Sequence, residues 1–294
     1  FEEKFFEING YDAKTILPEI FIDGLDASRT SRARYDFWLT VKKLYINAYM
    51  KQINDWCSAN GLLFTGHGGG EESLRYQTTS FTDMYEMCEN FSVPGIDTIF
   101  SHLYIDDYDY NITPKLVASA SHFLGRKRIL SETYTGSGWD MTMIGMKRIA
   151  NRLLLYGVNM LQFMGAFYSL NNFRKSFPVG YPPSHSWNNV LFKHYDHFNK
   201  YVSAMSWLNT NTELCARALM LNPCASARAL AGGPNLLALG EHLGPLNIHP
   251  LKDLDLTAQG IVNALTELNV PFEIVFEQVL DKCEVRDGYI HISG

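Results

Sequence analysis

The sequence lacks the features that bring a protein to nucleic acid or into a membrane. Its 294 residues carry a formal net charge of −6 and no long basic run, which argues against nucleic acid and anionic membranes as partners. No apolar stretch approaches the roughly 20 residues that span a bilayer. The opening FEEKFFEING has no basic segment followed by an apolar core, as a signal peptide would. We therefore expect neither nucleic acid nor membrane as a partner.

Paired cysteines are also missing. The five cysteines are widely spaced and form no CxxC or CxH pattern, which argues against a structural zinc site: Cys57, Cys88, Cys215, Cys224 and Cys283. Buried free thiols are the expected state, and they fit a reducing compartment such as the cytoplasm while leaving the localisation open. No cofactor is indicated, and the oligomeric state is left open.

What the chain does have is a globular composition with alternating elements. Hydrophobic residues make up 46% and charged residues 19%, so the chain can bury a full core. Apolar spacing predicts a long helix over 35–59. Four strands follow, each succeeded by a helix, over 62–65, 96–100, 128–132 and 158–163. Such alternation predicts a parallel sheet with helical crossovers.

Four strand–helix units make half of an eight-stranded barrel. We expect residues 1–210 to be an α/β unit, the C-terminal half of a (β/α)8 TIM barrel. Half a barrel leaves open sheet edges, so the missing half is expected from the parent chain or from another molecule. Residues 211–294 hold strands near 217–221, 272–276 and 289–292 and a helix near 256–268. They predict the beginning of a second α/β domain, flavodoxin-like and cut short.

The stretch KRILSETYTGSGWD indicates where chemistry would lie. Its apolar strand ends in Ser131-Glu132, and loops after barrel strands converge on one face. The same reasoning selects side chains after all four strands: His67, Glu71 and Glu72, then His102, then Glu132, Tyr134 and Trp139, then Tyr168. Aromatic rings stack on the C–H faces of sugars, and paired carboxylates supply acid with base or nucleophile. The pattern favours sugar chemistry.

Other interpretations stay open for these residues. The alternative for Glu132 is a surface residue at a strand end, and for one of Glu71 and Glu72 it is a solvated residue at a helix N-terminus. His67, Glu71 and His102 are conceivable metal ligands, but no HExxH motif is present, and we expect no catalytic metal. The triple glycine after His67 lacks the phosphate-loop pattern, and DDYDYN lacks the glycine and distal glutamate of a calcium loop.

Several segments together resemble a known enzyme family. YDFW (35–38), INDWCSANGLLFTGHGGGEESL (53–74), PGID (94–97), SETYTGSGW (131–139) and GVNMLQFMGAFYS (157–169) resemble the glycoside hydrolases related to family 106, the α-L-rhamnosidases, and more distantly the β-galactosidase barrels. The resemblance covers about residues 5–210. It implies a TIM barrel whose acid and base are carboxylates at strand ends.

The resemblance also has two departures. Related sequences carry an Asp-Glu-Pro strand ahead of the part that matches LPEIF (17–21), so one catalytic carboxylate is expected upstream of Phe1. They also tend to have a histidine where Gly165 stands.

From residues and resemblance together we expect a glycosidase. Glu132 would be the base or nucleophile. Glu72 or Glu71 would be the acid or a ligand of a sugar hydroxyl. The side chains expected to contact the carbohydrate substrate are His67, His102, Tyr134, Trp139 and Tyr168. A non-catalytic carbohydrate-binding barrel and a β-galactosidase-like glycosidase are the alternatives.

Overall fold

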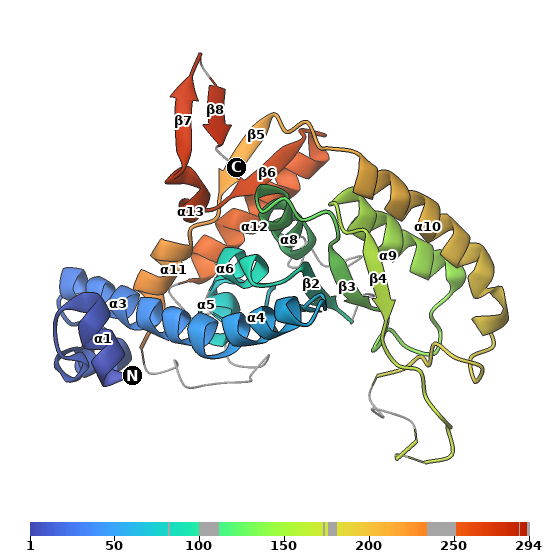
Figure 1. Ribbon diagram of the computed structural model, residues 1–294, viewed down its shortest axis with the longest axis horizontal. Coiled ribbons are helices and arrows are strands. Elements are labelled where there is room, and N and C mark those ends of the chain that lie inside the picture. Colours follow the sequence, from blue (N-terminus) through green and yellow to red (C-terminus); the bar gives the residue numbers. More distant parts are fainter. Residues whose placement is uncertain are drawn as a thin grey trace.

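The protein is a mixed α/β structure in which a parallel sheet is covered by helices (Figure 1). This computed structural model describes residues 1–81, 83–99, 112–172, 174–175, 181–233, 251–287 and 289–292. In Figure 1 the N-terminal helices lie at the left, the four-stranded sheet at the centre and right, and a hairpin projects at the top.

The main sheet contains four short parallel strands in sequential order. They are β1 (Thr65–Gly66), β2 (Val93–Thr98), β3 (Leu130–Thr133) and β4 (Met160–Phe163). Their order and direction confirm the predicted parallel arrangement. The first strand is shorter than predicted, because Leu62 and Leu63 are 51% and 75% exposed and lie outside the sheet. Within the described residues β1 and β4 each pair on one side alone, so the half-barrel stays a prediction.

Close packing between strands explains one glycine in the sheet. A Cβ added at Gly95 would lie 2.6 Å from the carbonyl oxygen of Gly66, on the neighbouring strand. Any larger residue at this position in β2 would therefore push β1 away.

Helices connect and cover the strands. Before β1 a continuous helical segment is formed by α3 (Ala27–Tyr45), the π-helical turn η2 (Ile46–Met50) and α4 (Lys51–Ala59), longer at its start than the predicted 35–59. It begins after Asp26, whose side chain accepts a hydrogen bond from the N–H of Arg29. The helices that follow are α5 (Leu74–Ser80), α6 (Met84–Glu89), α8 (Ile112–Phe123), α9 (Met143–Leu155) and α10 (Tyr195–Asn211), the last preceded by η4 (Phe192–His194).

The N-terminal residues build a small helical layer. It consists of α1 (Glu2–Asn9), η1 (Ala13–Ile16) and α2 (Leu17–Phe21), and it packs on α3. The indole N–H of Trp38 in α3 donates to the carbonyl of Ala231, after α11 (Cys224–Leu230), at 2.7 Å. A separate apolar cluster containing Phe5, Ile20 and Trp38 fills this layer.

The C-terminal residues add two further pairs of strands. The strands β5 (Ala218–Leu221) and β6 (Phe272–Val275) are parallel, and β7 (Cys283–Arg286) and β8 (Tyr289–Ile292) form an antiparallel hairpin. The remaining helices are α12 (Lys252–Glu267) and α13 (Glu277–Leu280). Met220 and Ile274 belong to the same apolar core as Ile96 and Leu116 of the main unit. The boundary at 210/211 and the flavodoxin-like domain stay predictions.

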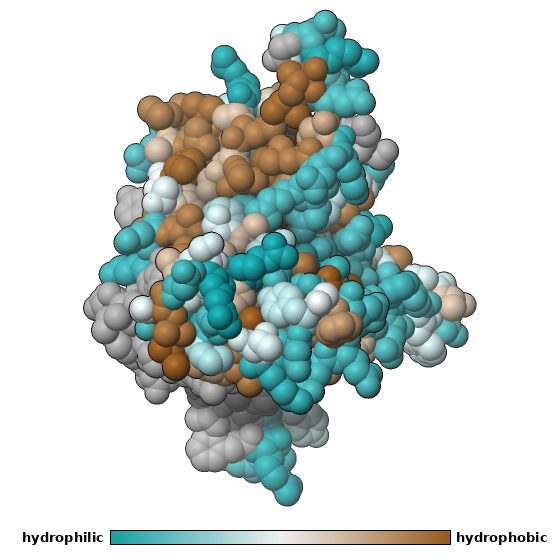
Figure 2. Space-filling model, turned by 90° about the vertical axis from the view of Figure 1, so that its left-hand side faces the viewer, coloured by the Kyte–Doolittle hydropathy of each residue, from teal (hydrophilic) through white to brown (hydrophobic). Residues whose placement is uncertain are grey.

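The C-terminal unit leaves apolar side chains at the surface. Leu219 and Leu221 of β5 are 39% and 45% exposed, and Val285 of β7 is 80% exposed. Figure 2, which views the molecule from the left-hand side of Figure 1, shows hydrophobic residues gathered in the upper part of that face. No helix within the described ranges is both long and apolar enough to cross a bilayer.

Candidate functional site

A row of polar side chains crosses the main sheet near the carboxyl ends of its strands. Asp97 of β2 is the register partner of Glu132 in β3, and Glu132 is the partner of Gln162 in β4. Partners on adjacent strands point to the same face of a sheet, so these three side chains share one face. Neither Asp97 nor Gln162 was among the predicted site residues. Their common face depends on the register between strands, which one sequence does not display.

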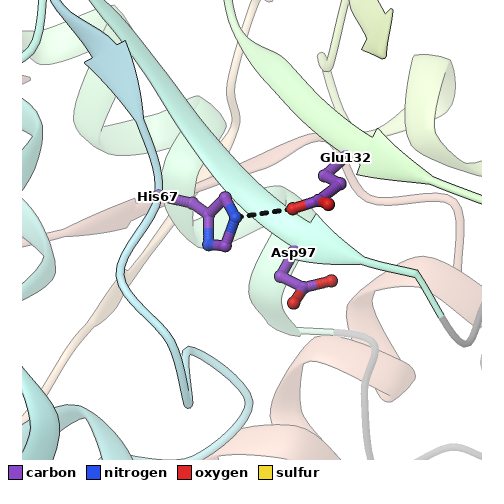
Figure 3. A group of neighbouring side chains, drawn as sticks. All are labelled: His67, Asp97 and Glu132. Atoms are coloured by element: carbon purple, nitrogen blue, oxygen red, sulfur yellow. Dashed lines mark hydrogen bonds and ion pairs between the residues drawn. The ribbon is translucent and has the colours of Figure 1, made fainter. Parts of the chain in front are cut away.

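His67 joins this row from the end of β1. Its Nε2 lies 2.7 Å from Oε2 of Glu132, and Figure 3 shows the imidazole facing both Glu132 and Asp97. Its Nδ1 lies 3.4 Å from Oε1 of Glu71, close enough for an ion pair but without hydrogen-bond geometry. The imidazole thus lies between two glutamates that are both predicted site residues, Glu71 after the first strand and Glu132 at the end of the third.

The surrounding carboxylates determine the charge of this histidine. The hydrogen bond to Glu132, followed by the contact with Glu71, raises the pKa of His67 to about 10 against the opposing effect of burial. The imidazole is therefore a cation at neutral pH, with a hydrogen on each nitrogen. Its Nε2–H donates to the Glu132 carboxylate.

Two other acids at the site hold their protons more tightly than usual. Burial, with smaller contributions from the negative charges of Glu71 and Asp97, raises the pKa of Glu72 to about 7. Burial also raises the pKa of Asp97, with a contribution from Glu132. At neutral pH a large fraction of Glu72 is a neutral acid that can donate a proton.

Glu71 is buried, with the His67 cation 3.4 Å away as its counter-charge. It has no exposed surface, and none of the described residues donates a hydrogen bond to either of its carboxylate oxygens. Its backbone is fixed instead, because the side-chain amide of Gln77 in α5 donates to the Glu71 carbonyl at 2.7 Å. A buried carboxylate without hydrogen-bond donors is unusual in proteins.

The side chains of His67, Asp97 and Glu132 could bind a cation. One ligand atom from each of His67, Asp97 and Glu132 lies within 4.8 Å of the others. A nitrogen and two carboxylates suit several divalent ions. The sequence pointed instead to His67 with Glu71 and His102 as the conceivable ligands. The expectation of no catalytic metal stays a prediction.

The aromatic residues predicted to contact substrate are placed differently from one another. Trp139 and Tyr168 are 52% and 73% exposed, on the loops after β3 and β4. Tyr134 has no exposed surface, and its hydroxyl donates to the carbonyl of Met146 at 3.0 Å. The prediction that Tyr134 contacts substrate is therefore corrected: its ring lies in the core, at a residue with a φ of 73°. His102 lies outside the described residues.

A cavity of about 230 Å³ lies elsewhere, between α8, α9 and α12. Its walls include Lys115, Tyr156, Thr266 and Phe272, and none of the predicted site residues lines it. The chemistry of the strand ends is thus separate from this cavity.

Comparison with known proteins finds similarity to a solved structure. No protein-family model and no curated protein matches the chain. A solved structure, the rhamnosidase from Novosphingobium sp. PP1Y, matches with a TM-score of 0.51 and 15% sequence identity. The match covers 75% of this chain and 21% of that protein, so the chain spans about a fifth of its length. The chain therefore has a mixed α/β fold with a parallel sheet that is similar to part of a rhamnosidase, a glycoside hydrolase.

Proposed function

We propose that the strand ends of the main sheet form an active site that hydrolyses a glycosidic bond, with an activity like that of the α-L-rhamnosidases related to family 106. The observation that carries the proposal is the carboxylate row Asp97–Glu132 beside the His67 cation and the neutral acid Glu72. The likeness of the fold to a rhamnosidase agrees with it.

The roles follow from the protonation states. Glu72, with its pKa raised to about 7, donates a proton to the glycosidic oxygen as the bond to the anomeric carbon breaks. Glu132 either attacks the anomeric carbon or removes a proton from the attacking water. His67 holds the Glu132 carboxylate in place at 2.7 Å. Asp97 and Gln162 lie in the same row and are suited to bind sugar hydroxyls.

The barrel is part of the same proposal. The four parallel strands would be the C-terminal half of a (β/α)8 barrel, whose other half comes from the same protein or from another molecule. In such a barrel the face that carries Asp97, Glu132 and Gln162 is the inner one, near the carboxyl ends of the strands where barrel enzymes have their sites.

The test is hydrolysis measured on the full protein. We expect release of p-nitrophenol from the aryl α-L-rhamnoside and no comparable release from the aryl β-D-galactoside. Preference for the galactoside would favour the β-galactosidase-like alternative. Binding of rhamnose without hydrolysis of either glycoside would favour a non-catalytic carbohydrate-binding barrel, and neither binding nor hydrolysis would refute the proposal. Loss of activity with a chelator would indicate a cation at His67, Asp97 and Glu132.

A further inference from the structure

Two helices hold the loop that carries the acid pair Glu71 and Glu72. We call residues 67–73, which connect β1 to α5, the acid loop. The carbonyl of Glu71 accepts from the side-chain amide of Gln77 in α5 at 2.7 Å and from the hydroxyl of Thr113, in the first turn of α8, at 3.4 Å. The position of the two glutamates therefore depends on where α5 and α8 lie.

Glycines let the acid loop pack tightly on α5. A Cβ added at Gly70 would lie 2.8 Å from the Cβ of Tyr76 in α5, and one added at Gly68 would lie 2.5 Å from the ring of Phe81, directly after that helix. Gly70 also has a φ of 85°, which residues with a side chain rarely adopt. The loop thus follows the surface of α5, and a shift of this helix would shift the glutamates with it.

A carboxylate of the C-terminal unit fixes the first turn of α5. Oδ1 of Asp255 in α12 accepts from the backbone N–H of Leu74 at 2.6 Å, across 181 residues of chain. Burial raises the pKa of Asp255 to about 6, and hydrogen bonds from the backbone of Leu74 and Arg75 oppose this effect. The carboxylate is therefore largely ionised at neutral pH, the form that accepts most strongly from backbone N–H groups.

This contact does more than begin the helix. The hydroxyl oxygen of Ser73 already accepts from the N–H of Tyr76 at 3.2 Å, so α5 has a local cap of its own. Leu74 is 3% exposed and lies in one apolar cluster with Leu251, the residue before α12. Asp255 thus adds a polar anchor where α5 and α12 already pack together.

We propose that Asp255 is a positioning residue, which anchors α5 to α12 and thereby holds Glu72 where it can protonate the leaving oxygen. The proposal rests on the glycosidase function proposed above and makes the C-terminal unit part of the catalytic apparatus. Asp255 acts through the acid loop. A group that only stabilises the fold affects every substrate alike, whereas one that positions the acid matters more when the leaving group needs the proton more.

The test compares two glycosides in the full protein. In methyl α-L-rhamnoside the leaving methanol takes the proton of Glu72 as the glycosidic bond breaks, whereas p-nitrophenolate leaves as a stable anion and needs that proton far less. Asp255→Ala should lower kcat/KM for the methyl glycoside about 10- to 100-fold. The loss for the p-nitrophenyl glycoside should be smaller by a factor of about five or more.

Three further variants sharpen the comparison. Asp253→Ala is the matched control, because Asp253 is an exposed acid in the same first turn of α12 and its loss should leave both rates unchanged. Asp255→Asn keeps an acceptor oxygen and should hold both rates within about threefold of the wild type. Asp255→Glu keeps the charge but moves it by one methylene. It should show the same dependence on the leaving group, and it replaces Asp255→Ala if that protein does not fold.

Equal losses on both glycosides in a folded variant would overturn the proposal and leave Asp255 as a structural cap, and so would unchanged rates in Asp255→Ala. Failure of the proposed function is a separate outcome, seen as a wild-type protein that hydrolyses neither glycoside. In that case, or if only the aryl glycoside is hydrolysed, hydrogen–deuterium exchange decides. Faster exchange over 67–77 in Asp255→Ala than in Asp253→Ala supports the anchor, and equal exchange overturns it.

Discussion

Two clusters in this protein place glutamate beside histidine, and they differ in how many donors surround the acid. The carboxylate of Glu273 in β6 lies 2.8 Å from the ammonium of Lys115 and 2.8 Å from Nδ1 of His122. It also accepts a hydrogen bond from the hydroxyl of Ser119. At the strand ends, three acids lie around the imidazole of His67, namely Glu71, Asp97 and Glu132, and the charge of His67 also acts on Glu72. No lysine or arginine of the described residues is among the charges that shift the pKa of Glu72 or Asp97.

The pKa values of the acids move in opposite directions in the two clusters. Burial alone would raise the pKa of Glu273, but His122, Lys115 and Ser119 lower it to about 2. Burial raises the pKa of Glu72 to about 7 with no comparable compensation. A buried carboxylate surrounded by donors is the usual arrangement in a folded protein, whereas acids short of donors are candidates for binding or catalysis. The predictions below test this difference.

The largest effect is expected from Glu132→Gln, measured as turnover of the aryl rhamnoside. The amide keeps the size of the side chain but removes the charge, so kcat should fall by about 10²–10⁴-fold or more while the melting temperature stays near that of the wild type. Glu7→Gln is the control, since it removes the charge of an exposed glutamate in α1 and should leave the fold intact. Wild-type turnover in a folded Glu132→Gln protein would exclude Glu132 from the mechanism and make Glu72 the principal candidate.

The next effect concerns stability, measured as the free energy of unfolding in urea. Glu273→Gln leaves the ammonium of Lys115, whose side chain is 4% exposed, without its counter-charge. Loss of one partner from a buried pair costs about 3 kcal/mol or more. Glu7→Gln removes the exposed Lys4–Glu7 pair and should cost less than about 1 kcal/mol. A Glu273→Gln protein as stable as the Glu7→Gln protein would show that the cluster is not structural.

The pH dependence of that difference gives a smaller effect. The pKa of Glu273 falls from 4.5 to about 2 on folding, so its ionised form stabilises the fold above about pH 4.5. This contribution is lost as the pH falls toward 2. Urea unfolding at pH 7, 5 and 3 should therefore show a constant gap between wild type and Glu273→Gln at the two higher values and a narrower gap at pH 3. A gap of equal size at pH 3 would contradict the lowered pKa.

The site could be predicted from the sequence where local pattern decides structure. An apolar strand followed by a glycine turn identified Glu132, and helical spacing identified most of the crossover helices. Asp97 and Gln162 could not be found, because they join Glu132 only through the register of three strands. Tyr134 was misplaced because a left-handed backbone reverses its side chain, a conformation uncommon for a residue other than glycine.

The packing of Trp187 and the Glu273 cluster could not be predicted for a related reason. Trp187 is held beside the loop after β4 because its two neighbours, Ser186 and Asn188, donate hydrogen bonds to the carbonyl of Phe167. Glu273 meets Ser119 and His122 across more than 150 residues of chain. Contacts of this range depend on how the elements pack, whereas composition and spacing report on neighbours in sequence.

The smallest effect is expected from Glu71→Gln, and it tests the comparison most closely. Glu71 and Glu273 are both buried glutamates beside a histidine, but neither oxygen of Glu71 receives a hydrogen bond from the described residues. Removing its charge relieves a desolvated carboxylate, while His67 keeps its bond to Glu132 at 2.7 Å. The new amide also lacks partners, so we expect the free energy of unfolding to change by less than about 1 kcal/mol in either direction. Activity should fall nonetheless, because His67 loses one of the two contacts that make it a cation. Urea unfolding and aryl rhamnoside kinetics on the same sample separate the two effects. A loss of stability as large as that of Glu273→Gln would mean that Glu71 is a structural ion-pair partner, and the proposed difference between the two clusters would fail.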